Sequence, residues 1–512
     1  MRAIYTVFLC FLTLELYATK DLSGLYASLD SFSVAKQLAF AKIYRNSEEG
    51  QLARSRAWFL LSGSDDEPPQ AIDELMIDRS SVLLFDNEQR EFDQFSNGAL
   101  LLIEELSKSL DHHRLKGKNL CSIEEILALE DDQVDLSRLL FLAMEIDFKK
   151  IREYEAYLDL MALQIKAQLK KLGVIVGQAQ NCKELEPTDV IDAINSFVFV
   201  EKRFLFPPLS VFEKQIDQYT FLDAVLERGR GVCLGISSLY LCLAQRLGLE
   251  LEIITPPGHI YLSYTKSGDP FNIETTRRGV HIPSEQYLRL DLKFLPKRCL
   301  KEIPGLHFFN QAGLFWQNKE YEKALAAYEK AMLYTPQDPL TKQFYAYCHL
   351  SLGKKNQALS MLSALKPFDY LIYQDTERED LLKGLCDIEV IENLHGLAHE
   401  SLQALLDQEK KLLEIIKGYP KFRSAYFYLA MNYLQTHRYG KAREVLQEYH
   451  SIDENNPLVE YYLSLLHREV LDYKSAWEHC SRAEALLKDH KELPKGLCAL
   501  KRNLAFLYPD HR

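Results

Sequence analysis

One cysteine and one histidine occur in settings that favour thiol chemistry. Cys233 follows Gly229-Arg230-Gly231-Val232, whose two glycines interrupt one helical stretch just before another begins. The free N–H groups and the positive end of the dipole at the first turn of a helix would stabilise a thiolate there. His259 follows Pro256-Pro257-Gly258. Either residue taken singly fits a buried core position, but together they form a candidate nucleophile and base for attack on an amide or ester carbonyl.

The segment that begins at Cys233 is expected to hold the thiol in place. Cys233–Leu247 has apolar residues at helical spacing, which predicts an amphipathic helix that ends before Gly248. Gly231 is interpreted as leaving room for a substrate to approach the backbone. A strand is predicted over residues 249–255, directly after the helix.

Two alternating stretches after this strand are expected to position the histidine. Residues 259–264 and 271–276 alternate apolar and polar side chains, which is typical of half-buried strands, and a glycine-containing turn separates them. If the hairpin buries its apolar faces together, its register places His259 on the same side as Asn272 and Glu274. A group beside the imidazole is needed to fix its tautomer and hold the ring, and both residues are candidates for that role.

These segments resemble a known family. The runs Gly231–Tyr240, Ala244–Leu249, Pro257-Gly258-His259 and Asn272–Thr276 are similar to the SirB-like branch of the transglutaminase-like superfamily. The likeness extends upstream through Phe221–Arg228 and begins near residue 130. It implies a papain-like core, in which a nucleophilic cysteine opens a helix packed against a sheet and a histidine and an acid lie on neighbouring strands.

By position, the resemblance implies the catalytic triad Cys233, His259 and Glu274, with Asn272 as the alternative orienting residue. The sequence departs from the family in having Glu274 where the superfamily usually has an aspartate. Many SirB-like members also lack the cysteine that this chain retains as Cys233.

Two functions are therefore expected. In the first, His259 takes the proton of Cys233, the thiolate attacks a carbonyl, and the acyl group passes to water or to an amine, which gives amide hydrolysis or acyl transfer. In the second, the chain is a non-catalytic interaction scaffold that retains a degenerate form of the same fold. The sequence contains no GxxxxGK[ST], HExxH, GxSxG or CxxC motif, so neither a cofactor nor a metal is expected.

The C-terminal part of the sequence is periodic. Ala324 and Ala358 lie one 34-residue step apart, as do Ala442 and Ala476, and small residues are needed where paired helices cross closely. The pattern resembles tetratricopeptide repeats, which implies a groove that binds a protein or peptide partner; the alternative is that the repeats only enlarge the core. The predicted units are residues 305–338, 339–372, a degenerate 373–422, 423–456, 457–490 and a capping helix over 495–507.

Length and charge complete the prediction. A chain of 512 residues is too long for one core, and its net charge of -12 disfavours nucleic acid as a partner. We predict a mainly α protein with one small α+β domain. Its parts are a helical N-terminal region (19–125) without recognisable chemistry, a transglutaminase-like core with a short antiparallel sheet (126–300), and an α-solenoid of repeats (301–512).

The N-terminus has the pattern of an export signal. Arg2 precedes an almost wholly apolar stretch, and Ala18 offers a cleavage site, so residues 1–18 are predicted to be a signal peptide. The protein is then expected to be exported to the periplasm, the envelope or the medium; otherwise it is cytoplasmic. No transmembrane span is expected after the signal.

Overall fold

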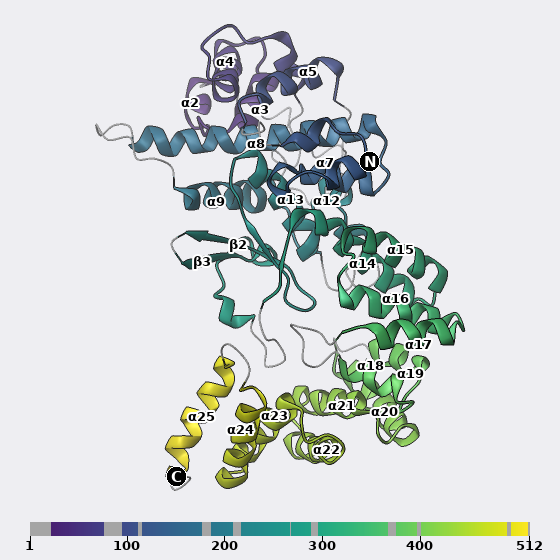
Figure 1. Ribbon diagram of the computed structural model, residues 1–512. Helices are drawn as coiled ribbons and strands as arrows, with labels where there is room; N and C mark the ends of the chain where they lie inside the picture. Colours follow the sequence, from purple (N-terminus) through teal and green to yellow (C-terminus); the bar gives the residue numbers. More distant parts are fainter. Residues whose placement is uncertain are drawn as a thin grey trace, which may run out of the picture. The chain divides into compact units, whose positions relative to one another are not determined.

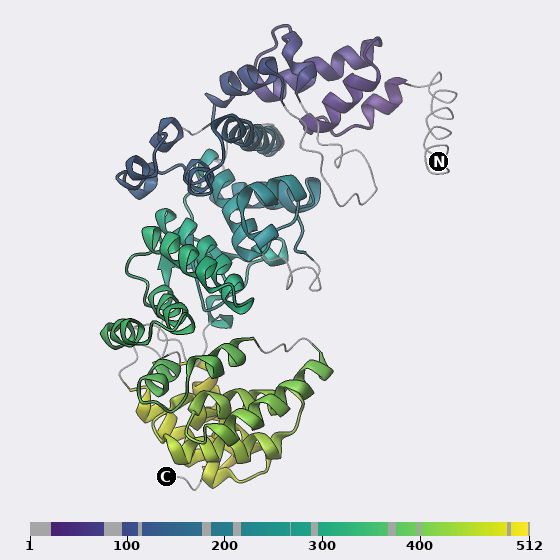
Figure 2. The same cartoon turned by 90° about the vertical axis from the view of Figure 1, so that its right-hand side faces the viewer.

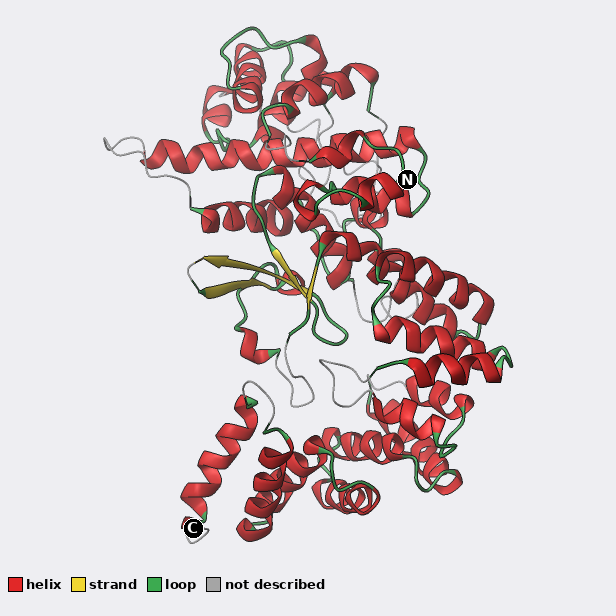
Figure 3. Ribbon diagram, viewed as in Figure 1, coloured by secondary structure: helices red, strands yellow, loops and turns green. Residues whose placement is uncertain are grey.

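The computed structural model describes residues 22–75, 95–110, 115–176, 186–207, 217–266, 268–287, 295–366, 375–396, 401–488 and 493–509 (Figure 1). Helices build most of this part of the chain, and the strands form one small group (Figure 3). The predicted fold class, mainly α with one short antiparallel sheet and helical repeats at the C-terminus, is confirmed. The predicted signal peptide lies outside the described residues. Within the described ranges, no helix combines the length and the apolar character needed to cross a bilayer.

The chain divides into two compact units. The first comprises residues 1–252, 273–280 and 299–301, and the second comprises residues 253–272, 281–298 and 302–512. The helices of the first unit are α2 (Leu22–Ala27), α3 (Val34–Ile43), α4 (Glu48–Ser62), α5 (Asn97–Ser107), α6 (Ile123–Leu127), α7 (Leu136–Ala143), α8 (Phe148–Val176), α9 (Pro187–Asn195), α11 (Asp217–Thr220), α12 (Leu222–Arg228) and α13 (Cys233–Arg246).

Serine caps begin three helices near the N-terminus of the first unit. The side chains of Ser33, Ser47 and Ser96 accept hydrogen bonds from backbone N–H groups in the first turns of α3, α4 and α5. All three helices pack against α8, whose 29 residues make it the long central element of this unit (Figure 1). The predicted helical N-terminal region therefore forms part of the same compact unit as α13.

The sheet contains four strands in the order β3-β2-β1-β4. In the antiparallel pair of β1 and β4, Ile253 lies opposite Arg298. The prediction of a half-buried strand over 259–264 was wrong in detail: the strand begins at Tyr261, and its successive residues Tyr261, Leu262 and Ser263 are all buried, so both faces are covered. The strands are β1 (Glu252–Ile254), β2 (Tyr261–Lys266), β3 (Asp269–Ile273) and β4 (Lys297–Arg298).

The rest of the second unit is a succession of antiparallel helices, which Figure 2 shows from the side. Helix pairs occupy four of the predicted repeats, three helices occupy the degenerate one, and a single helix coincides with the predicted cap. They are α14 (Ile303–Gln317), α15 (Tyr321–Tyr334), α16 (Pro339–Ser351), α17 (Lys355–Ala364), α18 (Asp375–Leu382), α19 (Ile388–His395), α20 (Leu402–Gly418), α21 (Arg423–Gln435), α22 (Tyr439–Ile452), α23 (Pro457–Glu469), α24 (Tyr473–Leu486) and α25 (Lys495–Leu507).

The 34-residue period corresponds to two features that recur in each repeat, a small residue at the helix crossing and a residue with positive φ in the turn. The small residues at the helix crossings, among them Ala324, Ala358, Ala442 and Ala476, are completely buried. The turn inside each helix pair also contains one residue with positive φ, and these residues again recur at 34-residue steps. They are Lys319 and Gly353 in the first two repeats, and His437 and Leu471 in the last two.

Replacing Leu471 with glycine is expected to stabilise the second unit by about 0.5–1 kcal/mol, because a leucine at φ 62° has a strained backbone that glycine does not share. Its side chain is 70% exposed, so little packing is lost. Urea unfolding measures the change. Leu333→Gly is the matched control: this leucine is equally exposed but lies inside α15, where glycine should destabilise by about 1 kcal/mol. A loss of stability in Leu471→Gly would contradict the strain argument.

Candidate functional site

Helix α13 presents Cys233 at its first residue, and its other residues are buried except Gln245 near its end. Within Gly231–Ala244, all of which the structure describes, Cys233 alone is partly exposed. The prediction of one apolar stripe was therefore wrong, because α7, α8, α9, α11, α12 and the short helix η6 (Thr275–Arg277) all pack against α13. The thiol is the one group through which this buried segment meets solvent.

The glycines before and after Cys233 serve packing. A Cβ at Gly231 would lie 2.9 Å from side-chain atoms of Ile236 and Val225, so the interpretation of Gly231 as room for a substrate is wrong. A Cβ at Gly235 would lie 2.5 Å from the carbonyl oxygen of Tyr219. Both glycines are needed because α13 begins in close contact with the segments that precede it.

The start of α13 retains hydrogen-bond donors. Val232 occupies the N-cap position and provides no side-chain hydrogen bond to the first turn. The N–H groups at Gly231 and Val232 are already used, since they donate to the carbonyls of Leu205 and Tyr219 at 3.1 and 2.9 Å. The N–H groups of the first turn itself, next to Cys233, are the ones suited to stabilising a thiolate or an oxyanion.

A buried charge network holds the other end of α13. The Arg246 guanidinium is completely buried; its Nε donates to Asp159 at 2.8 Å, and it lies 4.0 Å from the equally buried Asp135. Lys118 pairs with Asp159 at 2.7 Å, and Arg246 also donates to Ser137 Oγ at 3.1 Å. The Arg246 guanidinium and further hydrogen bonds hold the pKa of Asp135 below its usual value despite its burial. This network fixes α13 to α7 and α8.

Two polar contacts join α13 to its neighbours, one to the segment that follows β3 and one to α9. The hydroxyls of Ser237 and Thr275 lie 3.0 Å apart, and both are buried. Ser237 lies one helical turn after Cys233, so this contact places η6 against the same side of α13. The Tyr240 hydroxyl donates to Asn195 Oδ1 at 3.1 Å, which fixes α9 against α13.

Glu274 lies in the segment that follows β3, where its side chain stabilises the local backbone. Its side chain is 2% exposed and forms the N-cap of η6. One carboxylate oxygen accepts hydrogen bonds from the Thr276 N–H at 3.1 Å and from the Thr276 hydroxyl at 2.6 Å. The acid that the resemblance implies as the third catalytic residue therefore already uses one oxygen to shape its own turn.

His259 lies in the second unit, at the end of a tight turn. Its N–H donates to the Pro256 carbonyl at 3.0 Å, and Gly258 between them has φ 73°, which glycine tolerates and most residues do not. The ring is stacked on Tyr287, with 5.9 Å between ring centroids, and Tyr287 is stacked on Tyr261 at 4.1 Å. The imidazole is therefore held by an aromatic stack just before β2.

Asn272, on β3 in the same unit, has an amide that is fixed in one orientation. Its Nδ2 donates to the Ile282 carbonyl at 2.8 Å and to Ser284 Oγ at 2.9 Å. The side chain is 1% exposed, and within the part of the chain that the structure describes its Oδ1 accepts no hydrogen bond. A buried carbonyl oxygen of this kind is an unused acceptor.

The structure thus places Cys233 and Glu274 on packed elements of the first unit. His259, in the turn before β2, and Asn272, on β3, belong to the second. The pairing of Cys233 with His259 and the identity of the orienting residue stay predictions. Sequence reasoning missed Arg246, Ser237 and Thr275, the residues that hold α13. The only signal for Arg246 was a charged residue in a helix otherwise rich in apolar residues.

Comparison with known proteins identifies two parts of the chain. A family model described as the transglutaminase-like superfamily matches residues 152–293, and one described as a tetratricopeptide repeat matches residues 315–371. The chain therefore contains a transglutaminase-like domain followed by a tetratricopeptide repeat. No curated protein was found to match the chain.

Several solved structures are similar to part of the chain. The MamA protein is 14% identical, with 36% of this chain and 92% of that chain covered and a TM-score of 0.19. YrrB, described as a TPR protein with an unusual peptide-binding site, is 14% identical, with 39% and 92% covered and a TM-score of 0.20. A thermophilic TPR protein of Thermus thermophilus is 16% identical, with 40% and 98% covered and a TM-score of 0.20.

Proposed function

We propose that the chain is a thiol enzyme of the SirB-like type, which hydrolyses an amide or transfers its acyl group, and that its repeats bind the protein that carries the substrate. One observation carries the proposal: in a helix whose other residues are buried except Gln245 near its far end, the first residue is a partly exposed, unpaired cysteine beside N–H groups without a side-chain cap. A cysteine that served only packing would be buried like Cys242, whose thiol has its pKa raised by burial.

The proposed reaction needs only groups of this chain. His259 takes the proton from Cys233, and the thiolate attacks the carbonyl carbon of the substrate. The first-turn N–H groups of α13 stabilise the resulting oxyanion. The imidazolium then gives its proton to the leaving amine as the C–N bond breaks, which leaves an acyl-thioester. Water or a second amine, deprotonated by the imidazole, attacks the thioester and restores the thiol.

Asn272 is the orienting residue that we propose for His259. Its free Oδ1 is an acceptor fixed by two donations from Nδ2, which suits it to receive an imidazole N–H. Glu274, by contrast, is engaged at Thr276.

The pH-dependent alkylation of Cys233 by iodoacetamide tests the proposal. We expect Cys233 to react at pH 7 at least about tenfold faster than the exposed Cys121, and we expect His259→Ala to abolish this advantage. Both thiols are quantified in the same sample by peptide mass spectrometry, so Cys121 is an internal reference. Equal rates for the two thiols, unchanged in His259→Ala, would refute an activated cysteine.

A non-catalytic scaffold is the second candidate function, and the capping role of Glu274 favours it, because a carboxylate that shapes its own turn is not required for catalysis. Under this alternative the repeats still bind a protein or peptide. Cys233→Ala separates the two functions: the scaffold keeps all of its activity in cells, whereas the enzyme keeps partner binding but loses turnover.

Export is proposed from residues 1–18 alone. N-terminal sequencing of the mature protein, expressed in a bacterium, is expected to begin near Thr19. A mature chain that retains residues 1–18 in the cytoplasm would refute export.

A further inference from the structure

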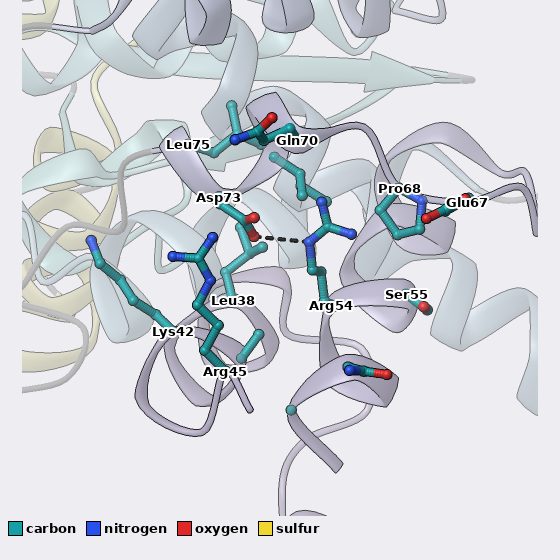
Figure 4. Close-up of a pocket in the computed structure, with 14 residues that line it drawn as sticks. Leu38, Lys42, Arg45, Arg54, Ser55, Glu67, Pro68, Gln70, Asp73 and Leu75 are labelled. Atoms are coloured by element: carbon teal, nitrogen blue, oxygen red, sulfur yellow. Dashed lines mark hydrogen bonds and ion pairs between the residues drawn. The ribbon is translucent and has the colours of Figure 1, made fainter. Parts of the chain in front are cut away.

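The first unit contains a cavity that the thiol chemistry does not use. Its volume is about 610 Å³, inside the range of roughly 300–1,000 Å³ that is typical of small-molecule sites. It is formed by the end of α3, the beginning of α4 and the short helix η1 (Gln70–Glu74), as Figure 4 shows. We call it the α3–α4 pocket. It belongs to the N-terminal helical region, for which the sequence indicated no function.

The inner lining of the α3–α4 pocket is apolar. Leu38, Ala41, Ile72 and Leu75 line it, and each is at most 7% exposed. These side chains belong to the core of the unit. Leu38, Ala41 and Leu75 each expose a small part to the pocket, so the apolar surface open to a ligand is small and fixed. A ligand that fits this surface has an apolar part.

The outer lining carries three cations. Lys42 and Arg45 are exposed, and within the described residues neither forms an ion pair or a side-chain hydrogen bond. Arg54 donates through Nε to Asp73 at 2.9 Å and through a terminal nitrogen to the Pro69 carbonyl at 2.9 Å. The bond to Asp73, drawn in Figure 4, and the bond to Pro69 hold the guanidinium at the pocket and leave its other terminal nitrogen as a donor.

The charged side chains that line the pocket have a net charge of +1. Lys42, Arg45 and Arg54 contribute three positive charges, and Glu67 and Asp73 contribute two negative ones, which gives +1. The whole chain, in contrast, has a net charge of -12. One negative charge on a ligand would neutralise the pocket, and a carboxylate matches the donor geometry of a guanidinium.

From this combination we propose that the α3–α4 pocket binds a small monocarboxylic acid with a compact apolar body. The apolar body lies on the exposed parts of Leu38, Ala41 and Leu75. The carboxylate lies at Lys42 and Arg45, within reach of the free nitrogen of Arg54.

Isothermal titration calorimetry of the full chain tests the proposal with three probes. Octanoate has both the charge and the apolar body, octanamide has the apolar body alone, and inorganic phosphate has charge alone. We expect measurable binding of octanoate and at least about tenfold weaker binding of the other two. Equal binding of octanoate and octanamide, or of octanoate and phosphate, would overturn the assignment. So would a tripeptide with a C-terminal leucine that binds more tightly than octanoate, because the occupant would then be a peptide.

Charge variants assign the binding to this pocket. Lys42→Gln and Arg45→Gln are each expected to weaken octanoate binding by about threefold to fivefold, as expected for exposed ion pairs. Lys36→Gln is the matched control, because Lys36 is an exposed cation of the same helix that does not line the pocket. Asp73→Asn is expected to strengthen binding, since it removes a competing carboxylate while Pro69 still holds Arg54; a misfolded variant would not bind more tightly. Unchanged affinity in all three pocket variants would place the binding elsewhere and overturn the proposal.

Discussion

Replacing Arg246 with methionine is expected to lower the free energy of unfolding of the first unit by about 3–5 kcal/mol. The guanidinium is completely buried between the carboxylates of Asp135 and Asp159, whose side chains are at most 3% exposed. Methionine fills the space of the aliphatic stem and carries no charge, so the substitution removes the compensating charge and leaves the space of the guanidinium empty. The free energy of unfolding falls because the carboxylates of Asp135 and Asp159 stay buried after the substitution but have lost the positive charge between them.

Urea unfolding followed by circular dichroism measures this loss. Arg152→Met is the matched control: Arg152 lies on α8 and pairs with Glu104 at 3.4 Å, but both side chains are more than half exposed. It should cost less than about 1 kcal/mol. If the two substitutions had similar effects, the network around Arg246 would not be the element that fixes α13.

The second large effect is expected at Asn272. If its Oδ1 orients the His259 imidazole, Asn272→Ala should slow the alkylation of Cys233 by about tenfold or more, because the ring loses the acceptor that selects its tautomer. Asn272→Asp keeps an oxygen at the place of Oδ1 but loses the two donations from Nδ2 that fix the side chain, so it should recover only part of the rate. Iodoacetamide labelling at pH 7 measures both variants.

Glu274→Gln is the comparison that separates the two orienting candidates. Glutamine keeps a side-chain oxygen that accepts the hydrogen bonds from Thr276, so the turn at η6 should be preserved. We expect the labelling rate of Cys233 to stay near that of the unmodified chain. A large fall in Glu274→Gln with no change in Asn272→Ala would assign the role to Glu274 and refute our proposal for Asn272.

Local sequence patterns predicted those parts of the fold that local physics determines. The period of the repeats was readable because each helix crossing requires a small residue at the same place, as at Ala324 and Ala358. The start of α13 at Cys233 and the positive φ of Gly248 after its end follow from glycine placement, which is also local.

The features that escaped prediction depend on neighbours that are distant in the sequence. Periodicity indicated one apolar stripe on α13, but elements from both sides of it in the chain bury the helix all along its length. Gly231 was interpreted as leaving room for a substrate, but side chains of Ile236 and Val225 fill the space beside it. β4, with two residues, is too short to produce an alternating pattern. The sequence could not decide whether Asn272 or Glu274 orients His259, because the two candidates differ in the hydrogen bonds that their side chains form, and a sequence does not show these bonds.

The burial of α13 has a consequence for how the thiol meets a substrate. A helix held by a buried guanidinium at one end and by close backbone contacts at the other cannot fray or slide without opening the whole unit around it. In the enzyme that we propose, the sulfur would therefore keep one position during turnover, and the entropy of aligning the reacting groups would be lost when the substrate docks. Selectivity then rests on which acyl groups fit around a fixed thiol, so a change of substrate would be found in variants of the surrounding residues and not in a more mobile α13.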